Sequence, residues 1–250
     1  MSKQNLPHLS IVIPAYNEEH RLPATLQKLA TYVAHVSFSC EAIVVVEPGT
    51  DQTADLAIKF SKTHAFCRVI ANTEHRGKGH AVRVGMLAAR GDVVIFMDAD
   101  MSVPVETVGV FREQFVSDPT LEILVGNRRH GGSQIVRAQG WLRRSLGQTF
   151  NRCVRLLSGI RLRDTQCGFK AFRRKVAREL FSRQTIDGFA FDVEILLLAQ
   201  KLGYKMRDFP VEWRNSSDSH VHIVHDSLAM LRDVVRLRLK SNSNSPLVGR

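Results

Sequence analysis

The sequence lacks long apolar runs. No stretch approaches the roughly 18–20 consecutive apolar residues that a helix needs to cross a bilayer. The N-terminal segment MSKQNLPHLS has no apolar core of the kind found in signal peptides. These absences exclude the usual sequence signals for membrane insertion and export, so we expect a cytoplasmic protein with residues 1–9 as an N-terminal tail.

Cysteines and aromatic residues are both scarce. The four cysteines form no C-x-x-C motif, and reduced thiols are the default in the cytoplasm. Aromatic residues make up 7% of the chain and do not interleave with basic residues as they do on single-strand nucleic-acid platforms. We therefore expect no nucleic-acid partner, although a non-catalytic nucleotide- or RNA-binding module stays open as an alternative.

Acidic residues are missing from one region. The net charge is +11, and the stretch Arg128–Arg178 holds many arginines and lysines but a single acidic residue, Asp164. Such an excess of one sign indicates an anionic partner, which means phosphate, an acidic membrane surface or nucleic acid. The alternative is a solvated basic surface that serves solubility.

The first half of the sequence alternates strand and helix patterns. A chain of 250 residues with 44% hydrophobic residues suits one α/β domain. We predict strands at Ser10–Pro14, Glu41–Val46, Arg68–Ala71 and Val93–Asp98, and helices at Arg21–Val33, Thr53–His64 and Ala81–Ala89. This rhythm predicts a mostly parallel sheet flanked by helices, with ligands beyond the carboxyl ends of the strands.

The second half is less regular. We predict helices at Val105–Phe115 and Phe191–Leu202, a strand at Leu121–Gly126, and basic amphipathic helices at Ile135–Leu157 and Ser227–Lys240. The two basic helices can lie on an acidic membrane surface, or their apolar faces can pack on the sheet. Residues 10–240 form the expected domain, and the polar residues 241–250 form a disordered tail.

Two carboxylates stand at the end of the predicted apolar strand Val93–Asp98. Asp98 and Asp100, at i and i+2 where the strand ends, can both point into the crevice. Oxygen ligands of this kind suit Mg²⁺ or Mn²⁺, which takes its remaining ligands from phosphate and water. The alternative is a pair of ordinary turn or cap residues.

Two further segments face the same crevice. After the strand Ser10–Pro14, the Tyr16 ring can stack on a nucleobase and Glu18 can accept hydrogen bonds from base or ribose. The alternative is a strand-to-helix turn with Asn17 as N-cap and Glu19 in the first turn. In Gly77–Gly79 (GKG) the lysine can meet a phosphate, and the alternative is a plain turn.

These motifs resemble a known family over nearly the whole range from Ser10 to Lys240. Their sequences are SIVIPAYNEE, GKGHAV, ARGDVVIFMDADMSVP, VGNRR, DTQCGFKAFRR and GFAFDVEILLLAQKLGY. Together they are similar to family 2 glycosyltransferases of the GT-A fold. DTQCGFKAF followed by FAFDVEIL most resembles the dolichyl- and polyprenyl-phosphate glucosyl- or mannosyltransferases.

The resemblance implies a set of site residues. Asp98 and Asp100 would hold the metal and the diphosphate. The nucleotide sugar would be lined by Pro14, Ala15, Tyr16, Glu18, Val46, Glu47, Lys78, Ala99, Met101, Lys170 and Arg214. After the second strand the family usually has an aspartate pair with glycine and serine, and here Glu47 stands in EPGTD instead.

The resemblance also implies an acceptor site. Arg128, Arg143 and Arg144 would clamp the acceptor phosphate, because guanidinium groups suit phosphate oxygens, and Arg129 can substitute for Arg128. Asp164 caps a turn, pairs with Arg163 or forms an active-site wall. Asp192 and Glu194 are positioning residues first and a catalytic base second, because a phosphate acceptor is already ionised near neutral pH.

The implied reaction is an inverting transfer of a hexose from a nucleotide diphosphate sugar to a polyprenyl or dolichyl phosphate. UDP-glucose is the favoured donor and GDP-mannose the next. The alternative acceptor on the same fold is a soluble molecule. Contact with a membrane would be peripheral, on its cytoplasmic face.

Overall fold

The computed structural model describes residues 7–128, 135–137, 152, 154–156, 159–160, 162–214 and 230–237. The first half alternates strands and helices as predicted. Its strands are β1 (Leu9–Ala15), β2 (Cys40–Val46), β3 (Cys67–Ala71) and β4 (Val93–Met97). Its helices are α1 (Leu22–His35), α2 (Thr53–Thr63), α3 (Lys78–Ala88) and α4 (Thr107–Ser117).

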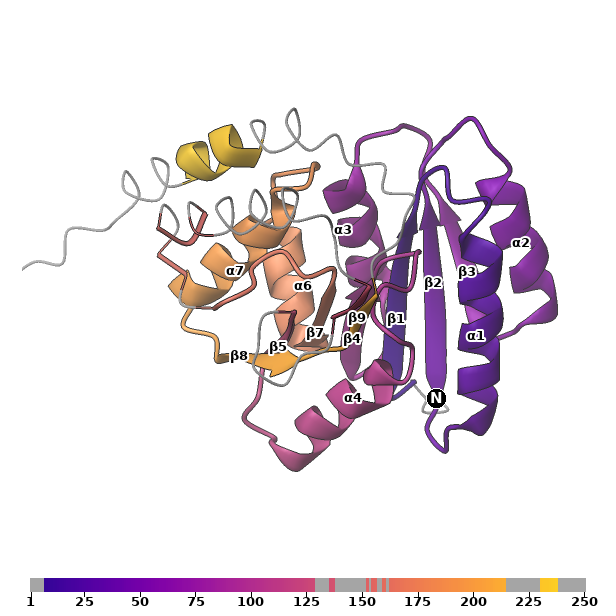
Figure 1. Cartoon of the computed structure of the whole chain (residues 1–250), viewed down its shortest axis with the longest axis horizontal. Helices are drawn as coiled ribbons and strands as arrows, with labels where there is room; N and C mark the ends of the chain where they lie inside the picture. Colours follow the sequence, from indigo (N-terminus) through magenta and orange to yellow (C-terminus); the bar gives the residue numbers. More distant parts are fainter. Residues whose placement is uncertain are drawn as a thin grey trace, which may run out of the picture.

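The second half completes the sheet. Its elements are β5 (Ile123–Asn127), β6 (Ile135–Arg137), β7 (Phe169–Arg173), α6 (Arg174–Ser182), α7 (Phe191–Lys201), β8 (Met206–Pro210) and β9 (Trp213–Arg214). The main sheet has seven strands in the order β3-β2-β1-β4-β7-β5-β8 (Figure 1). Only β7 runs against its neighbours β4 and β5, and the other pairs are parallel. The predicted α/β class with a mostly parallel sheet is confirmed.

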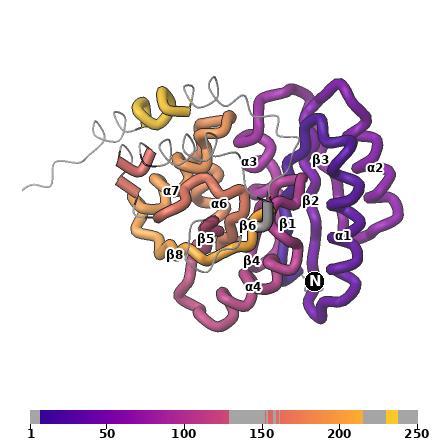
Figure 2. Tube along the Cα trace, in the orientation of Figure 1, coloured from indigo at the N-terminus to yellow at the C-terminus, as the bar shows by residue number. Residues whose placement is uncertain are grey.

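Helices cover both faces of this sheet. Ile11 and Ile13 of β1 belong to the core cluster that α1 and α4 complete, whereas Val12 belongs to the cluster that α3, α6 and α7 complete. Successive side chains of a strand point to opposite faces, so both faces of β1 are buried. The tube in Figure 2 runs from α1 and α2 at one end of the molecule to α7 and β8 at the other.

The two basic segments were expected to be helices, and each is helical in part within the described residues. Residues 230–237 are helical, and residues 154–156 are helical near the end of the other segment. Val234 and Val154 are fully buried in the cluster with α3, α6 and α7. The apolar side of each segment therefore packs on the protein core, at least in part.

The predicted helix Ile135–Leu157 is wrong at its start. Ile135–Arg137 is the strand β6, which pairs with β9 in a separate two-stranded sheet. The β-branched pair Ile-Val fits a strand once a partner is available, and Trp213 and Arg214 provide that partner. Among the residues that the structure describes, no helix has the length and apolarity to span a membrane.

Candidate active site

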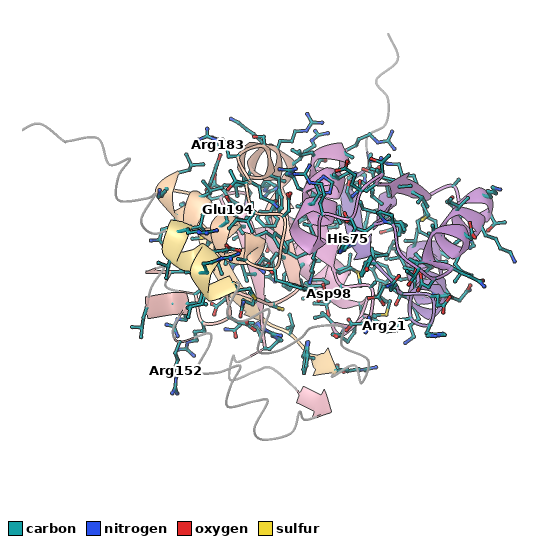
Figure 3. The ribbon with its side chains drawn as sticks, turned by 90° about the horizontal axis from the view of Figure 1, so that it is seen from above. Arg21, His75, Asp98, Arg152, Arg183 and Glu194 are labelled. Atoms are coloured by element: carbon teal, nitrogen blue, oxygen red, sulfur yellow. The ribbon has the colours of Figure 1, made fainter. Side chains whose placement is uncertain are left out.

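The candidate site lies at the edge of the sheet where β1, β2 and β4 end. β7 is antiparallel to β4 and places Phe169 opposite Met97, so the segment before β7 reaches the same edge. β5 is antiparallel to β7 and therefore parallel to β4, which brings Arg128 there as well. Residues from both halves of the chain thus meet around Asp98, and Figure 3 shows Asp98 between Arg21 on one side and Glu194 on the other.

Asp98 is held between α3 and the segment before β7. Its Oδ1 forms an ion pair of 2.6 Å with Nζ of Lys78, the first residue of α3. Its Oδ2 lies against Gly168, where an added Cβ would be only 2.0 Å from that oxygen. The Asp98 side chain nevertheless keeps 34% of its exposure, so the carboxylate is positioned yet open to a ligand.

Hydrogen bonds from neighbouring residues hold the rest of the D-x-D turn in place. The Ala99 side chain is buried, and its carbonyl oxygen accepts a hydrogen bond of 2.6 Å from Thr25 Oγ1. Asp100 Oδ1 accepts one of 2.9 Å from the backbone N–H of Ser102. Met101 has a positive φ of 49°, which closes the turn. Since Ala99 points inward, both aspartates stay partly exposed at the rim, as predicted.

This donor set fits a divalent ion that is shared with a diphosphate. Within the described ranges, no group of three or more His, Cys, Asp or Glu side chains is arranged to hold a metal alone. Mg²⁺ bound through one or two carboxylates plus substrate phosphates needs no such group. The ammonium of Lys78 on Asp98 shows that this carboxylate already accepts a cation.

A second ion pair lies directly behind Asp98. The ammonium of Lys170 on β7 is fully buried and donates to Asp192 on α7 and to the carbonyl oxygen of Cys167 at 2.6 Å. Burial raises the pKa of Asp192, against the opposing effect of Lys170 and Lys78. Because Lys170 is enclosed in this pair, the structure does not bring its ammonium to the open rim.

The carboxylates of Asp98 and Asp192 favour the charged form of Lys78. Burial by itself would lower the pKa of Lys78, but Asp98 and Asp192 outweigh it and raise that pKa above the ordinary value. Lys78 is therefore a cation across the physiological range. The structure brings Asp98, Lys78 and Asp192 together, and the roles of these residues stay predictions.

Arg128 is locked to Asp164. The guanidinium forms a two-pronged contact, with Nε 2.7 Å from Oδ2 and Nη2 2.9 Å from Oδ1, and the backbone N–H of Arg128 donates to Oδ2 at 3.1 Å. Burial alone would lower the pKa of Arg128, but Asp164 raises it. The guanidinium also lies 5.6 Å from the Trp213 ring centre. The structure thus pairs Asp164 with Arg128, and Arg129, Arg143 and Arg144 lie outside the described residues.

Tyr16 and Glu18 lie at the β1 end of the rim. The Tyr16 ring is 38% exposed and stacks on His75, with ring centres 4.1 Å apart and planes at 21°. Glu18 is held by Arg21, whose Nε and Nη2 lie 2.6 and 2.5 Å from its two oxygens. Asn17 has a positive φ of 52° and accepts from the Thr50 N–H at 2.9 Å. The alternative with Asn17 as N-cap is wrong, because α1 begins only at Leu22.

Glu47 anchors the loop that follows β3. Its carboxylate is almost fully buried and accepts hydrogen bonds of 2.7 Å from Asn72 Nδ2 and from the backbone N–H of Arg76. His75 and His80 lie 3.2 and 3.3 Å from its oxygens. Burial raises the pKa of Glu47, but these hydrogen bonds outweigh it and lower that pKa. Both oxygens therefore face the loop, so contact with a base or ribose would require the loop to move.

Glu194 anchors a second loop. Its carboxylate accepts from the Thr185 backbone N–H at 3.0 Å, from Thr185 Oγ1 at 2.6 Å and from the Ile186 N–H at 2.9 Å. That loop packs on the start of α3, where a Cβ on Gly79 would lie 2.7 Å from the Ile186 carbonyl oxygen. The structure thus gives Glu194 a positioning role at this loop.

The remaining predicted residues line the rim through their backbones. Ala15 and Val46 are buried in the core, and Pro14 lies one residue earlier in β1. The Val46 carbonyl oxygen accepts from the Asn72 N–H at 2.9 Å. Arg214 donates its backbone N–H to the Ser102 carbonyl oxygen at 2.8 Å, next to the D-x-D turn.

Sequence reasoning missed three features of this rim. They are Gly168 against Asp98, His75 on Tyr16, and the Arg128–Asp164 pair. Gly168 stands inside the DTQCGFK motif, so the glycine was visible but its partner was not. The contacts of Gly168 and Asp164 depend on β7 running antiparallel, and no local pattern signals that direction. The contact of His75 depends on the loop after β3 folding back to the end of β1.

Comparison with known proteins agrees with this geometry. The family model described as glycosyl transferase family 2 matches residues 10–181. Among solved structures, glucosyl-3-phosphoglycerate synthase from Mycobacterium tuberculosis in complex with Mn²⁺, UDP and phosphoglyceric acid superposes with a TM-score of 0.67. That match has 20% sequence identity and covers 97% of this chain and 81% of the other, so it supports the fold.

Two curated relatives are closer in sequence. The dolichyl-phosphate beta-glucosyltransferase of Drosophila melanogaster is 36% identical over 237 residues, which cover 90% of this chain and 73% of the relative. That of Dictyostelium discoideum is 33% identical over 243 residues, covering 93% and 74%. The chain belongs to glycosyl transferase family 2 and, within it, to the family of the dolichyl-phosphate beta-glucosyltransferases.

Proposed function

We propose that this chain transfers glucose from UDP-glucose to dolichyl or another polyprenyl phosphate, with inversion at the anomeric carbon. The observation that carries the proposal is the pair of partly exposed carboxylates, Asp98 and Asp100, at the carboxyl end of β4. The names of the relatives supply the sugar and the acceptor. Residues 10–240 would form the transferase domain, and its membrane contact would be peripheral, at the cytoplasmic face.

Asp98 and Asp100 would hold Mg²⁺ or Mn²⁺ together with the donor diphosphate. Such an ion stabilises the charge that develops on a departing diphosphate. Lys78 lies at the same carboxylate and is the nearest cation for the diphosphate itself. The Tyr16 ring offers an exposed face for the base.

The acceptor phosphate would be held on the opposite side by arginines. Arg128 is held in place by Asp164 and lies at the end of β5. Arg143 and Arg144 are the further candidates from the sequence. A phosphate oxygen is already ionised near neutral pH, so the site has to orient it rather than deprotonate it. Positioning and electrostatic stabilisation then supply most of the acceleration.

Asp98→Asn tests the proposal, with Asp92→Asn as the matched control. Asp92 lies just before the opposite end of β4 and its side chain is 63% exposed. The assay measures transfer of radiolabelled glucose from UDP-glucose to polyprenyl phosphate, extracted into an organic solvent. We expect Asp98→Asn to lose metal-dependent transfer with an unchanged melting temperature, and Asp92→Asn to keep both.

Three outcomes would contradict the proposal in different ways. Full turnover of Asp98→Asn would remove the role of this carboxylate. Label that stays in the aqueous phase would favour a soluble acceptor. A rise in melting temperature with GDP-mannose and Mn²⁺, but not with UDP-glucose and Mn²⁺, would change the donor, because a ligand that binds the native state stabilises it.

A further inference from the structure

Lys78 occupies the place where the proposed ion would bind. Its Nζ is 2.6 Å from Asp98 Oδ1, and both side chains are partly exposed. Asp192 and Asp100 also attract the same ammonium. Lys78 is therefore the positive charge that balances a group of carboxylates at the rim.

Gly168 closes one approach to the Asp98 carboxylate. Its Oδ2 lies so close to Gly168 that not even a methyl group fits between them. The carboxylate cannot swing toward that side to bind an ion while it keeps Lys78. An incoming divalent ion and the ammonium of Lys78 must compete for the side that faces α3.

The backbone around Lys78 is firmly held. Gly77 has a φ of +110°, a conformation that glycine adopts readily, and an added Cβ there would lie 2.9 Å from the Asp187 carbonyl oxygen. The His80 N–H donates to the same oxygen at 3.1 Å. The base of the Lys78 side chain is thus fixed, and only its flexible arm can change partner.

We propose that Lys78 is a tethered cation that holds the metal position on Asp98 in the donor-free enzyme and transfers to the donor diphosphate when the ion binds. The exchange makes the binding of ion and diphosphate cooperative, since each gains from the arrival of the other. The inference rests on the proposed function, because it requires a metal site at Asp98 and a diphosphate donor.

The experiment measures two affinities by calorimetry for the wild type and for Lys78→Met. The first is the affinity for Mn²⁺ alone, and the second is the affinity for UDP at saturating Mn²⁺. Loss of the competing ammonium should make Lys78→Met bind Mn²⁺ alone about two- to five-fold more tightly. Loss of the diphosphate contact should make it bind UDP at least about ten-fold more weakly.

Three further variants control the measurement. Lys78→Gln is a second neutral variant and should show the same two opposite changes. Lys78→Arg keeps the charge and should stay closer to the wild type in both affinities. Lys59→Met removes an exposed lysine of α2, remote from the rim, and should change neither affinity.

The opposite changes in affinity for Mn²⁺ and for UDP distinguish the exchange from an ion pair that only supports the structure. If neither neutral variant binds Mn²⁺ more tightly, or if UDP binding at saturating Mn²⁺ is unchanged in both, the exchange is refuted and the proposed function stands. If the wild type binds no Mn²⁺ even with UDP present, the metal site fails, and both the proposed function and this inference fail with it.

Discussion

Replacing Gly168 with alanine should disable the site without unfolding the protein. The added Cβ would lie 2.0 Å from Asp98 Oδ2 and 2.5 Å from its Cγ. Even a tight contact between these atoms needs 3.0 Å, so the carboxylate oxygen has to move away by about 1 Å. The nearest atoms belong to a side chain at the open rim, which can yield where a buried backbone could not.

A displacement of this size has a known scale of effect. A misplacement of about 1 Å in a catalytic group can reduce turnover about 100-fold, which corresponds to about 2.7 kcal/mol of barrier. We therefore expect kcat/KM for glucose transfer to fall by about two orders of magnitude. The cost to stability should stay within about 1–3 kcal/mol, the usual range for an overpacked site.

Gly188→Ala is the matched control. An added Cβ at Gly188 meets no atom within 4 Å, and this glycine stands in the loop before α7. Turnover of radiolabelled glucose and unfolding in urea are measured for both variants. Wild-type turnover in Gly168→Ala would refute the argument that Gly168 positions Asp98, and an equal loss in Gly188→Ala would show that any added methyl in this region has the same effect.

Two further predictions concern charged groups that stabilise the fold. Arg128→Ala breaks the ion pair of the almost fully buried Asp164 carboxylate with this guanidinium; unfolding in urea should show a loss of about 3–5 kcal/mol, and Arg128→Met combined with Asp164→Asn should recover much of it, whereas no recovery would contradict the argument that the loss comes from the broken ion pair. Burial raises the pKa of Glu41, but hydrogen bonds from Ser10 and Arg90 outweigh it and lower that pKa below 4.5. The wild type should therefore keep this stabilisation above pH 4.5 and lose it as the pH falls through the folded-state pKa; Glu41→Gln should show a shallower loss in acid, and an identical acid slope would contradict the assignment.

The parallel half of the fold could be predicted from the sequence because apolar residues dominate each of its strands. β2 and β4 lie in the middle of the sheet with both faces covered, so nearly every side chain in them is buried. Their carboxyl ends are followed directly by the charged residues Glu47 and Asp98. These charged residues also predict where the site lies, since ligands bind at the carboxyl ends of parallel strands.

Strands β7 and β8 of the second half were not predicted, because several charged residues interrupt their apolar pattern. β7 reads FKAFR, and its Lys170 is fully buried only because Asp192 on α7 pairs with it. A buried lysine in a strand breaks the apolar pattern, and its partner lies too far along the chain to be linked by spacing. β6 was predicted as part of a helix because its partner β9 follows much later in the sequence.

Three ion pairs at or behind the rim are formed before any ligand arrives. Asp98 pairs with Lys78, Asp164 with Arg128, and Asp192 with Lys170, and in each pair the partners come from different segments of the chain. Breaking a buried pair without replacement is strongly unfavourable, so a ligand has to exchange partners rather than simply add its charge. Only the Lys78 pair joins two partly exposed side chains, which makes it the pair that can open at least cost. A divalent ion arriving with a diphosphate supplies both replacements at once, one for Asp98 and one for Lys78. Because the Asp98–Lys78 pair is less buried than the other two, the site favours a ligand that carries both a positive and a negative charge.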